Sequence, residues 1–221
     1  MFLLLIVSSF LLLAVPVFTG IMVSIFFRWD FNKDRFKKVF FMGMFFFLIA
    51  QILLQIIGLF YSMNYDELPL FFNLWIKEIF IILLVAVSGY FLLLKKGIFR
   101  EGSYREFPFI FSYLSGYFFL SGLIKIIDSL FKFDTYILFL YPVICIVMLM
   151  FISMIIIEAG TRRGYISILI YSLLLPLSLG IALVPWLYYL SHSTVALGLA
   201  FVVLLGSGVI FYMLKKDYIG S

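Results

Sequence analysis

Residues 39–61 read VFFMGMFFFLIAQILLQIIGLFY, an apolar stretch without a single charged side chain. About 20 consecutive apolar residues suffice for an α-helix to cross the hydrocarbon core of a bilayer, which is about 30 Å thick. The rest of the chain has the same character, since 66% of its 221 residues are apolar and only 12% are charged. In soluble domains about half of the residues are apolar and about a quarter are charged. The sequence therefore predicts a protein whose solvent is lipid.

Apolar runs of this length recur along the whole chain. We expect seven membrane-spanning helices, at about 2–27, 39–61, 69–94, 107–127, 135–157, 166–190 and 195–214. The first run lacks a basic leader and a small-residue cleavage site, which disfavours a cleaved signal peptide. The start of the third helix stays open, because residues 66–76 could instead lie along the membrane surface. Residues 1–221 are thus predicted to form a single all-α transmembrane domain, a polytopic bundle of seven helices.

Lysine and arginine are distributed unevenly between the two ends of the predicted helices. Thirteen fall in alternate connections on one side, namely Arg28, Lys33, Arg35, Lys37, Lys38, Lys95, Lys96, Arg100, Arg105, Arg162, Arg163, Lys215 and Lys216. Only Lys77, Lys125 and Lys132 fall on the other side. Because cytoplasmic loops carry an excess of basic residues, this asymmetry predicts an N-terminus outside and a C-terminus in the cytoplasm. We expect a multi-pass protein of the cell membrane, with the lipid bilayer as its principal partner.

Composition and motif content argue against several function classes. The net charge of +5 could suggest nucleic acid, but the basic residues form short clusters between apolar runs, so no nucleic-acid partner is expected. Cys145 is the only cysteine and His192 the only histidine, too few for a site of converging metal ligands. Gly-rich phosphate loops and the G-x-S-x-G nucleophile elbow do not occur. We therefore expect no bound metal and no cofactor.

The stretch 154–167, MIIIEAGTRRGYIS, comes nearest to an enzyme motif. Its E-A-G-T-R segment resembles the second half of the E-E-x-x-x-R motif of the CAAX-protease-like intramembrane proteases, and the resemblance implies a catalytic role for Glu158. The chain departs from that motif at Ile157, where the paired glutamate is missing, and its one histidine is predicted on the opposite side. A lone carboxylate without a second acid, base or metal ligand is a poor general base. We interpret Glu158 as a membrane-boundary residue and expect no catalytic residues.

Two stripes of polar side chains recur at helical spacing within the predicted spans. One lies in 39–61 and the other begins in 107–127, and both start near mid-bilayer and continue toward the outer side. An outward-facing ligand cleft is one interpretation, and interhelical hydrogen bonds that hold the bundle together are the other. The small residues Ser112, Ser115, Gly116 and Gly122 also suit close helix packing. The candidate ligand-binding residues of the cleft are Gln51, Gln55, Glu78, Tyr117, Ser121, Lys125 and Asp128.

Helix geometry places two of these candidates at one height. A short connection joins the third and fourth spans, so we expect them to be antiparallel neighbours. Counted from that connection at about 1.5 Å per residue, Glu78 and Lys125 lie at heights of roughly 24 and 27 Å. An unpaired charge is costly at this depth, which favours an ion pair between them. Lys77 and Asp128 are predicted to form a second pair, and the alternative is that each lysine extends alone to the lipid headgroups.

These observations favour a non-catalytic membrane protein. We expect a membrane subunit of a transport or signalling assembly, in contact with other membrane protein subunits, or a small seven-helix sensor with an unidentified small-molecule ligand. The alternative is a facilitative small-solute transporter. Similar endings, SGYFLLLKK at 88–96 and SGVIFYMLKK at 207–216, suggest two three-helix repeats. With its N-terminus outside, that layout resembles the sugar-transporting SWEET family, although the proline-glutamine dipeptide of its PQ-loop relatives is absent. A membrane enzyme acting on lipid or peptide near Glu158 is the third interpretation.

Overall fold

The structure is a computed structural model that describes residues 33–60, 67–95, 103–129, 140–161 and 166–219. Apart from the turn at residues 190–192, these residues are helical, and no strand occurs among them. The predicted all-α class is therefore confirmed for the described part of the chain. The first predicted span, 2–27, lies outside it.

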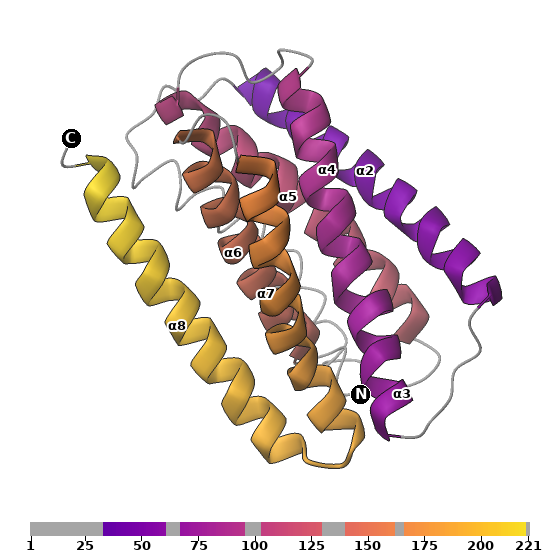
Figure 1. The fold of residues 1–221 in the computed structure, drawn as a ribbon. Helices are drawn as coiled ribbons and strands as arrows, with labels where there is room; N and C mark the ends of the chain where they lie inside the picture. The colour runs from indigo at the N-terminus through magenta and orange to yellow at the C-terminus, as the bar shows by residue number, and fades with distance from the viewer. Residues whose placement is uncertain (1–32, 61–66, 96–102, 130–139, 162–165, 220–221) are drawn as a thin grey trace.

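The described helices form a set of long rods (Figure 1). Three segments, α3, the π-helix η1 and α4, follow one another without a break and make one rod from Glu67 to Lys95. The bounds are Lys33–Phe60 for α2, Glu67–Leu74 for α3, Trp75–Phe80 for η1, Ile81–Lys95 for α4, Ser103–Ser129 for α5, Tyr141–Thr161 for α6, Ile166–Tyr189 for α7 and Ser193–Ile219 for α8. The continuity of this rod favours the longer third helix over a separate surface segment at 66–76.

The rods lie side by side and the chain reverses direction from each rod to the next (Figure 1). Helices α2 and α8 form opposite edges of the bundle, whereas the α3–α4 rod, α5, α6 and α7 lie between them. The core sits where α4, α5 and α6 meet, around Leu83, Leu114 and Met148, which have no exposed surface. The first and last residues of a rod lie at opposite ends of the bundle.

Two of the described helices are long and apolar enough to cross a membrane. They are Lys37–Gly58, with a mean hydropathy of 2.3, and Leu68–Leu93, with a mean hydropathy of 2.2. Shorter apolar stretches occupy 109–125, 141–153, 178–189 and 193–209. Only 17% of the first helix's apolar window is buried, against half of the second's. Helix α2 therefore presents most of its apolar surface to the surroundings, as a lipid-facing helix does.

Glycine allows α2 and α5 to touch through their backbones. A Cβ added at Gly43 would collide with the Tyr113 carbonyl of α5, and a Cβ added at Gly116 would collide with the Phe40 carbonyl of α2. The Tyr117 and Phe47 rings meet in a T-shaped arrangement beside this contact, with ring centroids 5.2 Å apart. The sequence-based expectation that Gly116 serves close helix packing is confirmed. This contact places Tyr117, which belongs to the polar stripe of α5, next to α2.

Candidate functional site

The predicted pair of Glu78 and Lys125 is present in the structure. The Lys125 Nζ lies 2.5 Å from each Glu78 carboxylate oxygen and joins η1 to α5. The two side chains retain 21% and 22% of their exposure, so water or headgroups still reach them. A bidentate contact of this kind stabilises two charges that would otherwise be costly near hydrocarbon. The ion pair lies toward the end of the bundle where α2 and α5 end.

Tyr141 extends the polar contact from α5 to α6. Its ring centroid lies 5.4 Å from Lys125 Nζ, a distance at which the π electrons attract an ammonium ion. Its hydroxyl is hydrogen-bonded to the Ser121 Oγ. Both Tyr141 and Ser121 are almost completely buried. The ammonium ion thus has the Glu78 carboxylate and the Tyr141 ring as neighbours from two other elements.

Tyr117 completes the inward-facing stripe of α5. Its hydroxyl donates a hydrogen bond of 2.7 Å to the Ile82 carbonyl oxygen of α4, and its side chain has no exposed surface. The predicted residues Tyr117, Ser121 and Lys125 therefore each contact a different helix from their own. The side chain of Asp128 lies outside the described residues, so its pairing with Lys77 stays a prediction.

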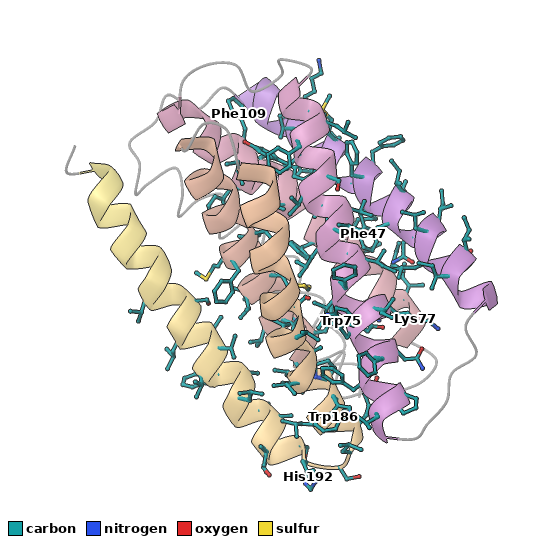
Figure 2. All side chains as sticks on the ribbon, viewed as in Figure 1. Phe47, Trp75, Lys77, Phe109, Trp186 and His192 are labelled. Atoms are coloured by element: carbon teal, nitrogen blue, oxygen red, sulfur yellow. The ribbon has the colours of Figure 1, made fainter. Side chains whose placement is uncertain are left out.

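The π-helical turn explains how one short segment reaches two helices. The Ile81 N–H donates to the Ile76 carbonyl, five residues back rather than four. Such a turn advances through a smaller angle per residue than an α-helix does. Trp75 and Glu78, three positions apart, would share one face of an α-helix. Here the indole N–H of Trp75 (labelled in Figure 2) donates a hydrogen bond of 2.8 Å to Ser178 Oγ of α7. Glu78 instead contacts Lys125 of α5.

The polar residues of α2 do not join this group. Gln55 is exposed, on the side of α2 that also presents Leu48 and Ile52, and Gln51 is half-buried. The structure thus brings together Glu78 and the α5 residues of the candidate site, while Gln55 points away from them. Sequence periodicity placed each stripe on one face of its helix but carried no information on which way that face turns.

Three participants were not anticipated from the sequence. Tyr141 and Ser178 lie in apolar runs whose periodicity does not single them out, and a π-helical turn has no sequence signature that would indicate Trp75.

Asn73, close before that turn, is 3% exposed, and neither atom of its amide has a hydrogen-bond partner in the part of the chain described. A polar side chain in an apolar run, FFNLWI, was the available signal. A buried amide of this kind is costly unless something binds it.

Glu158 and His192 lie apart from the ion pair, whereas Cys145 lies beside Tyr141 and close to the pair. Helix α6 continues to Thr161, so Glu158 belongs to its last turns; the Glu158 side chain is outside the described residues. His192 is exposed in the turn between α7 and α8. Cys145 is a buried free thiol of α6. Among the described residues, no three His, Cys, Asp or Glu side chains are grouped so that they could hold a metal ion.

A small apolar hollow, open to the surroundings, lies between α6, α7 and α8. Only aliphatic side chains line it, so it offers no hydrogen bond or charge to a polar ligand. The lining residues are Val143, Ile144, Val147, Ile181, Val184, Ala200 and Val203.

Charge and hydrogen bonds around Lys125 therefore join η1, α5 and α6, and the Trp75 indole joins η1 to α7.

Comparison of the chain with protein-family models, with curated proteins and with solved structures finds no match.

Proposed function

We propose that the chain is a seven-span membrane protein that acts without catalysis, as a membrane subunit of a transport or signalling assembly. The exposed apolar faces of the two edge helices support the membrane placement. Phe41, Phe45 and Ile52 of α2 are 60% to 63% exposed, and Phe201 and Val202 of α8 are 61% and 65% exposed. Patches of large apolar side chains on this scale are unfavourable in water and natural in lipid.

The observation that carries the non-catalytic role is that three pairs of interior polar side chains are bonded to each other across helices. Glu78 with Lys125, Ser121 with Tyr141, and Trp75 with Ser178 are each joined across two helices. Side chains used in this way hold the helices in register, whereas a general acid or base must face a reacting group. A bundle fastened internally, with apolar outer faces, is suited to a subunit that other membrane proteins contact.

The proposed orientation has the N-terminus outside and the C-terminus in the cytoplasm. The alternation of rod directions supports it, because it puts the basic starts of α2 and α5 at the same end as the basic end of α4 (Figure 1). In intact cells, a cysteine replacing Ser193 should react with an impermeant thiol reagent, and a cysteine replacing Gly102 should react only after permeabilisation. The reverse pattern would exclude this orientation. The parent chain, whose only thiol is the buried Cys145, is the control.

Co-purification from native membranes tests the role in an assembly. In a mild detergent we expect a second membrane protein to accompany the chain in a fixed ratio, and to be released by a harsher detergent. Recovery of this chain alone, with the orientation experiment giving the expected labelling, would contradict the subunit role while leaving the membrane placement intact.

Ligand binding, as a sensor or a facilitative small-solute transporter, is the second candidate function. It is favoured by Asn73, whose amide is buried beside a π-helical turn, a feature that is frequent at functional sites. A panel of polar solutes, screened by thermal stability of the purified protein, should contain at least one that raises Tm. Asn73→Leu should remove that shift, whereas Lys77→Gln, on the neighbouring turn, should retain it. No solute-dependent shift in the unsubstituted protein would contradict this candidate.

A further inference from the structure

Helix α2 carries a regular row of exposed side chains on the face turned away from α5. Phe41, Phe45, Leu48 and Ile52 are 63%, 60%, 47% and 61% exposed, and Gln55 is also exposed. Successive members of this row are four, three, four and three positions apart. That alternation is the spacing of the contact positions in a left-handed helix pair, in which each side chain fits between those of the facing helix. We call these five residues the α2 seam.

Gln55 is the exceptional member of the α2 seam. It lies between Leu54 and Ile56, so apolar residues flank it on both sides along the helix. Among the described residues its amide has no hydrogen-bond partner, and the other four residues of the α2 seam are apolar. In a bilayer, hydrocarbon cannot satisfy an amide, whereas a polar group on a facing helix can. A second helix on this face would therefore gain hydrogen bonds that lipid does not provide.

Helix α8, at the opposite edge of the bundle, shows that this spacing alone does not identify a docking surface. Along α8, Val195, Gly198, Val202, Leu205 and Val209 are exposed at the same alternating spacing. None of these residues has a polar side chain. Because lipid tails are as apolar as leucine, an apolar row has little reason to exchange lipid for protein. The amide of Gln55 distinguishes the α2 seam from this row.

We propose that the α2 seam docks against the α2 seam of a second copy of this chain, forming a parallel dimer about an axis along the membrane normal. A primary amide is both donor and acceptor, so two Gln55 side chains related by a two-fold axis can satisfy each other. Two copies inserted with one orientation place Gln55 at the same depth, so the amides meet without a change of register. The opposite face of α2 is already occupied by α5 through Gly43. This inference rests on the proposed membrane placement and goes beyond the proposed subunit role.

Site-directed crosslinking in native membranes tests the geometry of the dimer. Cysteines replacing Leu48 or Ile52, in the α2 seam, should form disulfide-linked dimers several times more efficiently than a cysteine replacing Leu53, which is exposed but lies outside the seam. Val202→Cys is the matched control on the α8 row. Equal crosslinking at Leu53 or Val202 would overturn the proposal. An adduct with a different protein, or no dimer because residues 2–27 of the same chain cover this face, would also overturn it.

Energy transfer between labelled copies, diluted into phosphatidylcholine vesicles, tests the role of the amide. Gln55→Leu should weaken dimerisation between about threefold and thirtyfold, the range measured for polar contacts between membrane helices. Gln55→Asn should recover part of the affinity, and Gln51→Leu, one turn away but outside the seam, should change it little. Undiminished dimerisation of Gln55→Leu would refute the pairing of the amides. Labelling of Ser193→Cys from outside in the same variants separates loss of the dimer from loss of membrane insertion.

Discussion

The two edge helices, α2 and α8, are attached to the bundle in different ways. At α2, Gly43 and Gly116 bring two backbones together, and a Cβ at either position would collide with a carbonyl of the other helix. Along α8, a Cβ added at Gly198, Gly206 or Gly208 would meet no atom within 4 Å. Glycines in apolar helices therefore have different roles according to the face on which they lie. Their presence in the sequence does not reveal which role applies.

The α8 side is held by small inward-facing side chains instead. Ala196 and Ala200 are buried, and the hydroxyl of Ser207 donates 2.7 Å to the Leu204 carbonyl of its own helix and lies 3.5 Å from Met150 Sδ of α6. The apolar hollow between α6, α7 and α8 borders Ala200. We infer that substitutions which add volume are tolerated better at the α8 edge than at the α2–α5 contact.

Alanine substitutions at glycine provide the largest test of this difference. Gly43→Ala or Gly116→Ala should lower the free energy of unfolding in mixed micelles by about 1–3 kcal/mol or more, because the helices must move apart. Gly58→Ala on α2 and Gly198→Ala on α8 should change it by less than about 1 kcal/mol, in the stabilising direction, because alanine favours helix. Equal effects at Gly43 and Gly198 would remove the distinction between the two edges.

The ion pair of η1 and α5 sharpens the comparison, because no such contact fastens α8 within the described residues. Glu78→Lys and Lys125→Glu should each cost about 1–3 kcal/mol of stability, less than for a fully buried pair since about a fifth of each side chain is exposed. Combining the two substitutions should recover at least half of the loss, measured as Tm and as unfolding free energy. A double variant no more stable than either single variant would show that the pair does not link the helices energetically.

The hydrogen bond from Trp75 to Ser178 connects the two sides of the molecule, since it joins η1 to α7. Trp75→Phe and Ser178→Ala should each reduce stability, and a double-mutant cycle should give a coupling of about 0.6 kcal/mol, the average for hydrogen bonds between membrane helices. A coupling indistinguishable from zero would mean that this hydrogen bond does not link η1 to α7 energetically.

A substitution in the turn between α7 and α8 should have the smallest effect on stability, and it should stabilise the protein. Ser191 has φ 67°, its N–H donates to the Tyr188 carbonyl, and the His192 N–H donates to the Leu187 carbonyl. This is the helix-ending geometry in which glycine is usual. Ser191→Gly should relieve the strain of the left-handed backbone and raise stability by roughly 0.5–1 kcal/mol. A fall in thermal stability would indicate that the serine side chain has a favourable contact that offsets the strain.

Sequence alone was sufficient wherever the property depended on position along a helix axis. Apolar run length predicted the helices of the described part of the chain, and a constant rise of about 1.5 Å per residue placed Glu78 and Lys125 at one height. The structure confirms their contact. It could be predicted because a short connection between consecutive helices favours antiparallel neighbours. For the close α2–α5 contact, the sequence indicated only that the fourth span carries small residues, and it did not indicate which helix they would contact.

Rotation about each helix axis was decided only by the tertiary structure. The outward direction of Gln55 follows from the contact of Gly43 with the Tyr113 carbonyl, and the separation of Trp75 from Glu78 follows from a π-helical turn. Both depend on residues distant in sequence. Height accumulates locally, one residue at a time, and can be counted along the chain. The direction a helix face turns is fixed by the neighbours that the helix packs against, and in lipid an apolar face carries almost no signal of its own.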